Sequence, residues 1–269
     1  MAVDADHETA LREGDLSAAL SALQARIRKA PGDAKLRTAL FQLLCVMGDW
    51  QRAVAQLKLC GELDPAALPM AQTYREAIIC EVFREKVFAG ERAPLFLGEP
   101  PEWLALMAEA LKLLAQGDAE AAAGLRARAF EEAPASPGTL DGASFDWIAD
   151  ADSRLGPVLE AIVDGKYFWL PFAAVASIEV DPPEDLRDAV WTPCRITFAN
   201  EGDTVALIPT RYPGTAANGT DAEKLSRATS WTDLGGDAFA GSGQRLLAMP
   251  DGDAALMDAR SLRMGGAVG

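Results

Sequence analysis

Hydrophobic positions in the first half of the chain recur at helical spacing, in segments that end at glycine or proline. Amphipathic spacing of this kind is typical of helices that bury one face. The pattern predicts helices over residues 3–13, 16–29, 34–47, 50–63, 68–89, 102–116 and 118–133. The first half is therefore expected to be a layered helical domain.

The helical half also repeats itself. Gly14-Asp15 and Gly48-Asp49 are 34 residues apart, as are Pro31 and Pro65, and a third copy begins at Gly117-Asp118. Glycine permits the turn between two helices, and proline stops the second one. Small residues recur at the position where the second helix approaches the first: Ala19, Ala53 and Ala122. A period of about 34 residues built on helix pairs predicts degenerate tetratricopeptide (TPR)-like repeats.

Stacked helix pairs leave a groove that commonly takes a helix or an extended peptide. The repeat register predicts that the following residues line it: Lys35, Thr38, Gln42, Cys45, Leu104, Met107 and Leu111. The alternative is that the chain's own second half covers them. Residues 66–101 break the period. In their Pro-rich loop, Leu95, Phe96 and Leu97 either pack on the helical core or form an apolar contact for a partner.

Short alternating segments separated by turn residues replace the helical pattern after residue 143. Strands are predicted over 145–149, 157–163, 167–170, 177–180, 194–198, 204–209, 246–249 and 255–258, with a helical turn over 185–189. Residues 212–243 are expected to form a long connection, and the Gly-rich stretch 235–244 a flexible loop. The fold class is thus α+β. A TPR-like domain (1–134) and a short linker (135–143) precede a β-rich domain (144–264) with a small, curved sheet.

Composition and net charge narrow the classes of partner that this protein is expected to bind. The chain has 269 residues, 49% of them hydrophobic, and a net charge of −15. Such an acidic surface disfavours nucleic acid and anionic membrane surfaces as partners. The four cysteines form no CxxC pair, and no apolar run is long enough to cross a membrane. We expect a cytoplasmic protein; the sequence indicates no oligomeric state.

The sequence contains few residues that could catalyse a reaction or bind a metal or a cofactor. The only histidine, His7, lies in the first predicted helix, where we expect it to be half exposed. No nucleotide-binding or hydrolase motif is present, so neither a cofactor nor a metal site is predicted. Asp146, Asp150, Asp152 and Glu160 could bind a divalent metal or act as an acid/base pair. Their alternation with apolar residues favours a structural role, with Asp152 or Asp150 pairing Arg154.

Further arginine and aromatic residues are candidates for the same polar network. They are Trp147, Trp169, Arg187, Asp188, Trp191, Arg211, Tyr212, Trp231 and Arg245. Such residues are favoured both at interfaces and as buried hydrogen-bonded struts, and the sequence does not separate the two.

Several stretches resemble the ImpE family, also called the SciE-type or TagJ family of bacterial type VI secretion accessory proteins. They are FDWIADADSRLGPVLEAIVDGKYFWLP (145–171), PPEDLRDAVW (182–191), ALIPTRYPG (206–214) and GSGQRLLA (241–248). LREGDLSAAL, LLCVMGDWQRA and LGEPPEWL match as well. The resemblance runs from about residue 11 to residue 262.

The resemblance implies a non-enzymatic adaptor. It would bind the N-terminal helix of the small sheath subunit, TssB, and influence disassembly of the contractile sheath by the ATPase ClpV. An enzyme using Asp150, Asp152, Arg154 and Arg211 is the alternative. A third possibility is that the second domain is a rigid platform that closes one end of the helical array.

Overall fold

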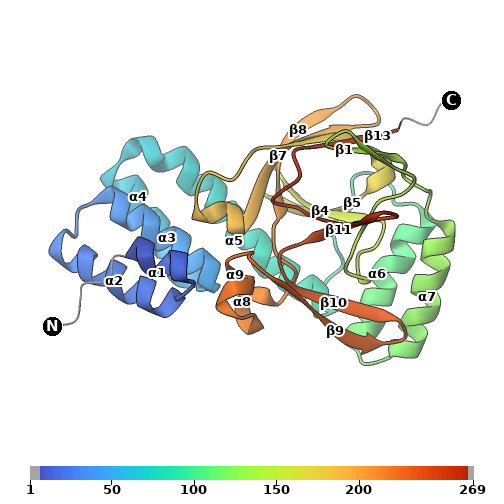
Figure 1. The fold of residues 1–269 in the computed structure, drawn as a ribbon, viewed down its shortest axis with the longest axis horizontal. Coiled ribbons are helices and arrows are strands. Elements are labelled where there is room, and N and C mark those ends of the chain that lie inside the picture. Colours follow the sequence, from blue (N-terminus) through green and yellow to red (C-terminus); the bar gives the residue numbers. More distant parts are fainter. Residues whose placement is uncertain (1–6, 266–269) are drawn as a thin grey trace.

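The computed structural model describes residues 7–265 and is helical in its first half and strand-rich in its second (Figure 1). The helices are α1 (His7–Glu13), α2 (Leu16–Lys29), α3 (Ala34–Met47), α4 (Trp50–Leu63), η1 (Pro65–Ala67), α5 (Leu68–Phe88), α6 (Glu102–Ala115) and α7 (Ala119–Glu132). All seven predicted helices are confirmed within two residues at each described end. Residues 3–6 of the first lie outside the described residues.

The predicted turn residues set the helix boundaries. Gly14, Gly48 and Gly117 have φ values of 81°, 76° and 87°, the left-handed region that glycine adopts without strain. The aspartate that follows each of these glycines accepts a hydrogen bond from a backbone amide in the first turn of the next helix. The first half therefore folds into consecutive packed pairs: α1 with α2, α3 with α4, and α6 with α7.

An eight-stranded antiparallel sheet dominates the second half. Its order is β2-β1-β13-β6-β7-β8-β4-β5. The strands are β1 (Gly138–Leu140), β2 (Ala143–Phe145), β4 (Val158–Val163), β5 (Lys166–Pro171), β6 (Val175–Val180), β7 (Trp191–Phe198), β8 (Asp203–Pro209) and β13 (Ser261–Met264). The expectation of a small sheet was wrong, because the short first and last strands of this region join the same sheet. Residues 138–140, placed in the expected linker, form β1.

Two smaller sheets complete the region. β12 (Gly252–Ala255), β11 (Leu246–Met249) and β3 (Ala149–Asp150) form one, and the hairpin of β9 (Thr229–Gly235) and β10 (Ala238–Gly243) forms the other. Short helices are η2 (Phe172–Ala174), η3 (Leu186–Ala189), α8 (Thr215–Asn218) and α9 (Asp221–Lys224).

Three local predictions in this half were wrong. The segment 145–149 is not one strand, because β2 ends at Phe145 and the chain crosses to another sheet before β3. Residues 256–258 form a turn, in which the Asp258 amide donates to the Ala255 carbonyl, and strand β12 ends at Ala255. The Gly-rich stretch 235–244 is not a flexible loop, because it forms the turn of the β9–β10 hairpin and strand β10, which pairs with β9. Glycine is needed at 241 since a Cβ there would overlap the Tyr212 ring.

The helices and the sheet share a hydrophobic core, and a second cluster of buried residues lies within the strand-rich half. A single cluster of buried residues includes Leu44 of α3, Met107 of α6, Ile162 of β4 and Trp191 of β7. Figure 1 shows α1–α4 at one end of the molecule and α6–α7 at the other, with α5 running between them. Helix α5 is therefore the element that ties the helical array to the sheet.

Segments of the second half cover one side of the helical array. Helix α3 packs against η3 and α8. The Leu16 amide at the start of α2 donates to Asp221 of α9 (3.0 Å). An apolar groove between α4 and α5 stays open to solvent.

Candidate functional site

A buried ionic network lies where α5 meets the sheet. Glu160 of β4 has no exposed surface and accepts hydrogen bonds from Arg84 Nε (2.6 Å) and Arg84 Nη2 (2.7 Å). It also accepts from Arg245 and from the Tyr167 hydroxyl, and Arg245 pairs on its other side with Asp150. Four charged residues far apart in the sequence thus neutralise one another in the core.

Tryptophans extend the network on both sides. Trp191 Nε1 donates to Glu81 of α5 (3.1 Å), and Trp169 Nε1 donates to the Tyr167 hydroxyl (2.7 Å). Trp191 also lies against the rings of Trp50 and Tyr74, with centroid separations of 6.1 and 5.6 Å. The indole groups therefore join helices to strands.

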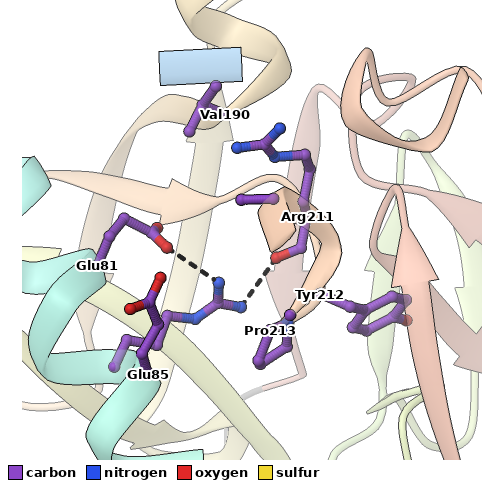
Figure 2. A pocket seen from close by; sticks show the side chains of 9 residues that line it. Glu81, Glu85, Val190, Arg211, Tyr212 and Pro213 are labelled. Carbon is purple, nitrogen blue, oxygen red and sulfur yellow. Dashed lines mark hydrogen bonds and ion pairs between the residues drawn. The ribbon is translucent and has the colours of Figure 1, made fainter. Parts of the chain in front are cut away.

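Arg211 anchors the sheet to the end of α3. Its Nη1 donates to the carbonyls of Val46 (2.7 Å) and Lys224 (2.8 Å), while its own carbonyl accepts from Arg84 (2.8 Å; Figure 2). Burial lowers the pKa of Arg211 to about 10, against the opposing effect of Glu81. The group remains a cation at neutral pH.

The cavity beside this network is small. It is lined by Glu81, Arg84, Arg211 and Tyr212 among others and has a volume of about 20 Å³ (Figure 2). That volume holds about one water molecule. Of Asp150, Asp152, Arg154 and Arg211, only Arg211 lines this cavity.

The other predicted network residues also form local contacts. Asp152 pairs with Arg154 Nε (2.8 Å) and accepts from the Gly241 amide (2.9 Å). Arg187 pairs with Asp185 and lies over the Tyr74 ring. Asp188 accepts from the Glu184 and Asp185 amides. Trp147 is 43% exposed and Trp231 is 40% exposed, and the Trp231 ring lies against the Tyr212 ring with a centroid separation of 5.4 Å.

Arg84 and Glu81 were not singled out in the sequence, although both are central to the network. Both lie on the buried face of α5, which also carries Ala77, Ile78 and Cys80. Glu81 and Arg84 are three residues apart, so they are neighbours on that face. A charged pair on an otherwise apolar helical face was the signal that could have identified them. The expectation for His7 was wrong: it is buried, because α1 packs on α2, where its Nδ1 lies 2.8 Å from Arg26 Nη1.

The hydrogen bonding of the buried polar groups favours a structural role for the network. Among the described residues, every buried side-chain nitrogen or oxygen has a hydrogen-bond partner, and no group of three His, Cys, Asp or Glu residues could hold a metal ion. Burial raises the pKa of both Cys80 and Cys194 to about 12, so neither supplies a thiolate nucleophile near neutral pH.

The pKa of Glu160 provides a test of the network. Burial alone would raise this pKa, but the charges of Arg84 and Arg245 outweigh burial and lower it to about 2. The carboxylate therefore stabilises the fold above its unfolded-state pKa, and the contribution is lost as the pH falls from about 4.5 towards 2. We expect its assigned carboxyl ¹³C resonance to remain that of a carboxylate at pH 3.5. A titration midpoint near 4.5 would contradict the network.

An apolar groove lies between α4 and α5, on the side that the second half leaves uncovered. It has a volume of about 520 Å³, and its walls include Val54, Ala55, Leu68 and Ala71. Leu68 is 55% exposed, which is high for a large apolar side chain on a helix that belongs to the core. The groove is a candidate docking surface on the helical array.

The groove predicted from the repeat register is covered. Leu104, Met107, Leu111 and Cys45 are buried in the core, so the prediction that they face a partner was wrong. Helix α3, which carries Cys45, is covered by η3 and α8, and the three α6 residues belong to the cluster of buried residues that helices and strands share. Lys35 is exposed, and Thr38 and Gln42 are half-buried. Thr38 lies against Cys60 of α4 (3.6 Å) rather than against an open groove.

The loop before α6 borders a second apolar groove of about 350 Å³, lined by Phe96 and Leu97 with Pro100, Pro101 and others. Leu97 is 48% exposed. The Leu95 carbonyl accepts from the Trp169 amide (2.9 Å), so the loop covers the edge of strand β5. Covering an edge strand prevents unwanted pairing with other chains.

Comparison with known proteins adds to this geometry. The family model described as "ImpE protein" matches residues 142–263. The Type VI secretion system accessory component TagJ of Pseudomonas aeruginosa is 53% identical over 255 residues, covering 95% of this chain and 89% of the relative. The chain belongs to the ImpE/TagJ family.

A solved structure supports the fold. The crystal structure of protein VPA1032 from Vibrio parahaemolyticus matches with a TM-score of 0.88 and 28% identity, covering 97% of this chain and 98% of that one. The two-part α+β architecture is thus shared with a relative in an experimental structure. Among residues 7–265, no helix is long and apolar enough to cross a membrane.

Proposed function

We propose that this protein is a cytoplasmic, non-enzymatic accessory component of a type VI secretion system. Its degenerate TPR-like helices bind the N-terminal helix of a TssB-like small sheath subunit. Through that contact the protein modulates sheath assembly or ClpV-dependent disassembly. The name of the 53% identical relative supports the accessory role.

The apolar groove between α4 and α5 carries the proposal. An amphipathic helix binds by laying its apolar face into such a groove. The exposed Leu68 and the small Ala55 and Ala71 offer apolar walls, while Lys58 and Arg75 provide a polar rim. The groove faces away from the segments of the second half that cover α3, so a partner could reach it without unfolding the chain.

Calorimetry with a synthetic peptide of the sheath subunit's N-terminal helix tests the proposal. We expect the full-length chain to bind it, and Ala71→Trp to weaken binding at least about tenfold, because the indole fills the groove. Leu97→Ser, in the groove beside β5, is the matched control and should bind like the unaltered chain. Failure of the unaltered chain to bind at about 100 μM peptide would reject the proposal. Loss of binding only in Leu97→Ser would move the site to the loop at 95–97.

A further inference from the structure

Strand β9 is an open sheet edge in the strand-rich half. It forms a two-stranded sheet with β10, so it has a neighbouring strand on one side only. Figure 1 shows β9 at the lower border of the molecule, with β10 between it and the strands above. β9 has seven residues, whereas β2 and β12, which also end their sheets, have three and four. It is therefore the longest of these three edges.

The sequence of β9 does not block this edge. An uncovered edge is a template for pairing with another chain, and proteins commonly prevent such pairing with lysine or proline on the strand. Thr229–Gly235 contains neither. The Arg126 side chain of α7 donates to the Gly236 carbonyl in the turn of the hairpin, and this contact holds the strand in place. A preorganised edge loses less conformational freedom when it pairs.

The outer backbone groups of β10 already have partners. The Phe239 amide donates to the Ser153 hydroxyl (3.0 Å), and the Phe239 carbonyl accepts from the Ser153 amide (3.1 Å). The Gly241 amide donates to Asp152 (2.9 Å). In an antiparallel pair, residues directly opposite each other either exchange both backbone hydrogen bonds or point these groups away from one another. Phe239 and Gly241 are of the second kind, because their groups point away from β9.

The residues of β9 opposite them must therefore point away from β10. These are Asp233 and Trp231, and Thr229 lies opposite Gly243, whose carbonyl accepts from the Tyr212 amide (2.9 Å). The N–H and C=O groups of Thr229, Trp231 and Asp233 thus point to the open side of β9. In the described part of the chain, no hydrogen bond reaches them. They form a row of donors and acceptors that one more antiparallel strand would satisfy.

The charges along this edge are complementary to those of a second copy. Arg227 precedes the strand, Asp233 lies near its end, both are exposed, and residues 227–233 carry no other charge. When two copies of β9 run antiparallel about a two-fold axis at Trp231, Thr229 of one copy lies opposite Asp233 of the other. Arg227 then lies diagonally across from that Asp233, within reach of a long side chain. Opposite charges therefore meet at both ends of the pairing.

Both charged side chains have capacity left for this contact. Arg227 Nη1 donates to the Arg12 carbonyl (3.2 Å), and Asp233 accepts from the Gly235 amide (2.8 Å). Within the described part of the chain, neither side chain forms an ion pair. A guanidinium has five N–H donors, and a carboxylate accepts at both oxygens. An ion pair between the two copies can therefore form without breaking either of these bonds.

We infer that two copies of this chain associate through β9, as an antiparallel sheet in the order β10-β9-β9-β10. The two-fold axis passes at Trp231, whose side chain is 40% exposed in one copy and is covered by its equivalent in the other. Aromatic pairs across neighbouring strands stabilise such a sheet. The inference goes beyond the proposed function and does not depend on it. Helix α4 lies at the other end of the molecule from the hairpin (Figure 1), so a dimer carries two α4–α5 grooves.

The net charge opposes this association, and the small contact makes it weak. Each copy carries a net charge of −15, so the two copies repel each other. Salt at about 0.15 M screens repulsion beyond about 8 Å, whereas the paired charges are in contact. Pairing along one strand buries less than the roughly 1,200 Å² of a stable interface. We therefore expect a reversible dimer with a Kd on the order of 100 μM.

Sedimentation equilibrium of the full-length chain measures the association. Between about 10 μM and about 1 mM chain, the weight-average mass should rise from 28.5 kDa towards twice that value. The rise should reverse on dilution. A mass that stays at 28.5 kDa at about 1 mM would overturn the inference, and it would leave the proposed function standing.

Charge reversal distinguishes β9 pairing from any other self-association. Arg227→Asp and Asp233→Arg should each raise the Kd of the dimer at least about fivefold, because each contact occurs twice about the axis. An equal mixture of the two variants should associate like the unaltered chain, since every facing pair then has opposite charges again. Local damage to the fold by either substitution would not be reversed by mixing.

An exposed aspartate away from the hairpin provides the matched control. Asp203→Arg on β8 should leave the Kd unchanged. If Arg227→Asp does not fold in urea denaturation, Asp233→Lys repeats the reversal at a residue that bonds within the hairpin. Association that is insensitive to reversal at 233, or that is not restored by mixing the two folded variants, would reject β9 as the interface.

Discussion

Replacing Arg245 with methionine is expected to lower the free energy of unfolding by about 3–5 kcal/mol, because it leaves buried carboxylates without their cation. Arg245 has no exposed surface and pairs with both Asp150 and Glu160. Its Nε also donates to the Pro209 carbonyl (3.0 Å). Arg84 remains beside Glu160, but nothing replaces the cation at Asp150. Urea denaturation of the purified chain measures the loss.

An exposed arginine is the matched control for Arg245. Arg195 pairs with Asp203 across neighbouring strands at 2.8 Å, with more than half of each side chain exposed. Arg195→Met should change the free energy of unfolding by no more than about 1 kcal/mol, because solvent screens exposed ion pairs. Similar losses in the two variants would show that burial of the network contributes little to stability.

Trp191→Ala is expected to cost about 3–5 kcal/mol of stability, as for other fully buried tryptophans. The residue has no exposed surface and joins β7 to the helices through Trp50, Tyr74 and Glu81. Its removal leaves a cavity in the shared core and deprives the buried Glu81 of an indole donor. The transition midpoint in urea should fall for helical and tertiary probes together, since both halves share this core.

Trp147→Ala controls for the loss of a tryptophan alone. Trp147 is 43% exposed, so the variant should stay within about 1 kcal/mol of the unaltered chain. If Trp191→Ala destabilised only the strand-rich half and left the helices folded, the two halves would be independent units. That result would count against the third possibility, in which the second domain is a rigid platform that closes one end of the helical array.

The polar network shows why sequence reasoning identified candidates but not their partners. Asp150, Arg154 and Arg245 were selected as charged residues in apolar surroundings. Of the two expected partners of Arg154, the structure pairs it with Asp152, whereas Asp150 is bound by Arg245, 95 residues away. Arg84 was overlooked because a single arginine in a helix usually faces solvent. Only the packing of α5 on β4 makes it a buried partner of Glu160.

Strand prediction failed where segments were short or rich in glycine. β1 and β13 have three and four residues, too few for alternation to be distinctive. β10 contains two glycines that read as loop, yet Gly241 is there because the Tyr212 ring occupies the space of a Cβ. Such close approaches depend on neighbours that the local sequence does not contain.

The sequence by itself determined the helices, their 34-residue repeat, the α+β division and the resemblance to the ImpE family. Helical periodicity, glycine turns and aspartate caps act over a few residues, so they can be identified locally. The tertiary structure decided which surface of the repeats is free. It filled the groove beside α3 with η3 and α8, buried Leu104, Met107 and Leu111, and left open the groove between α4 and α5. That outcome depends on contacts between segments that are distant in the sequence and pack into a shared cluster of buried residues.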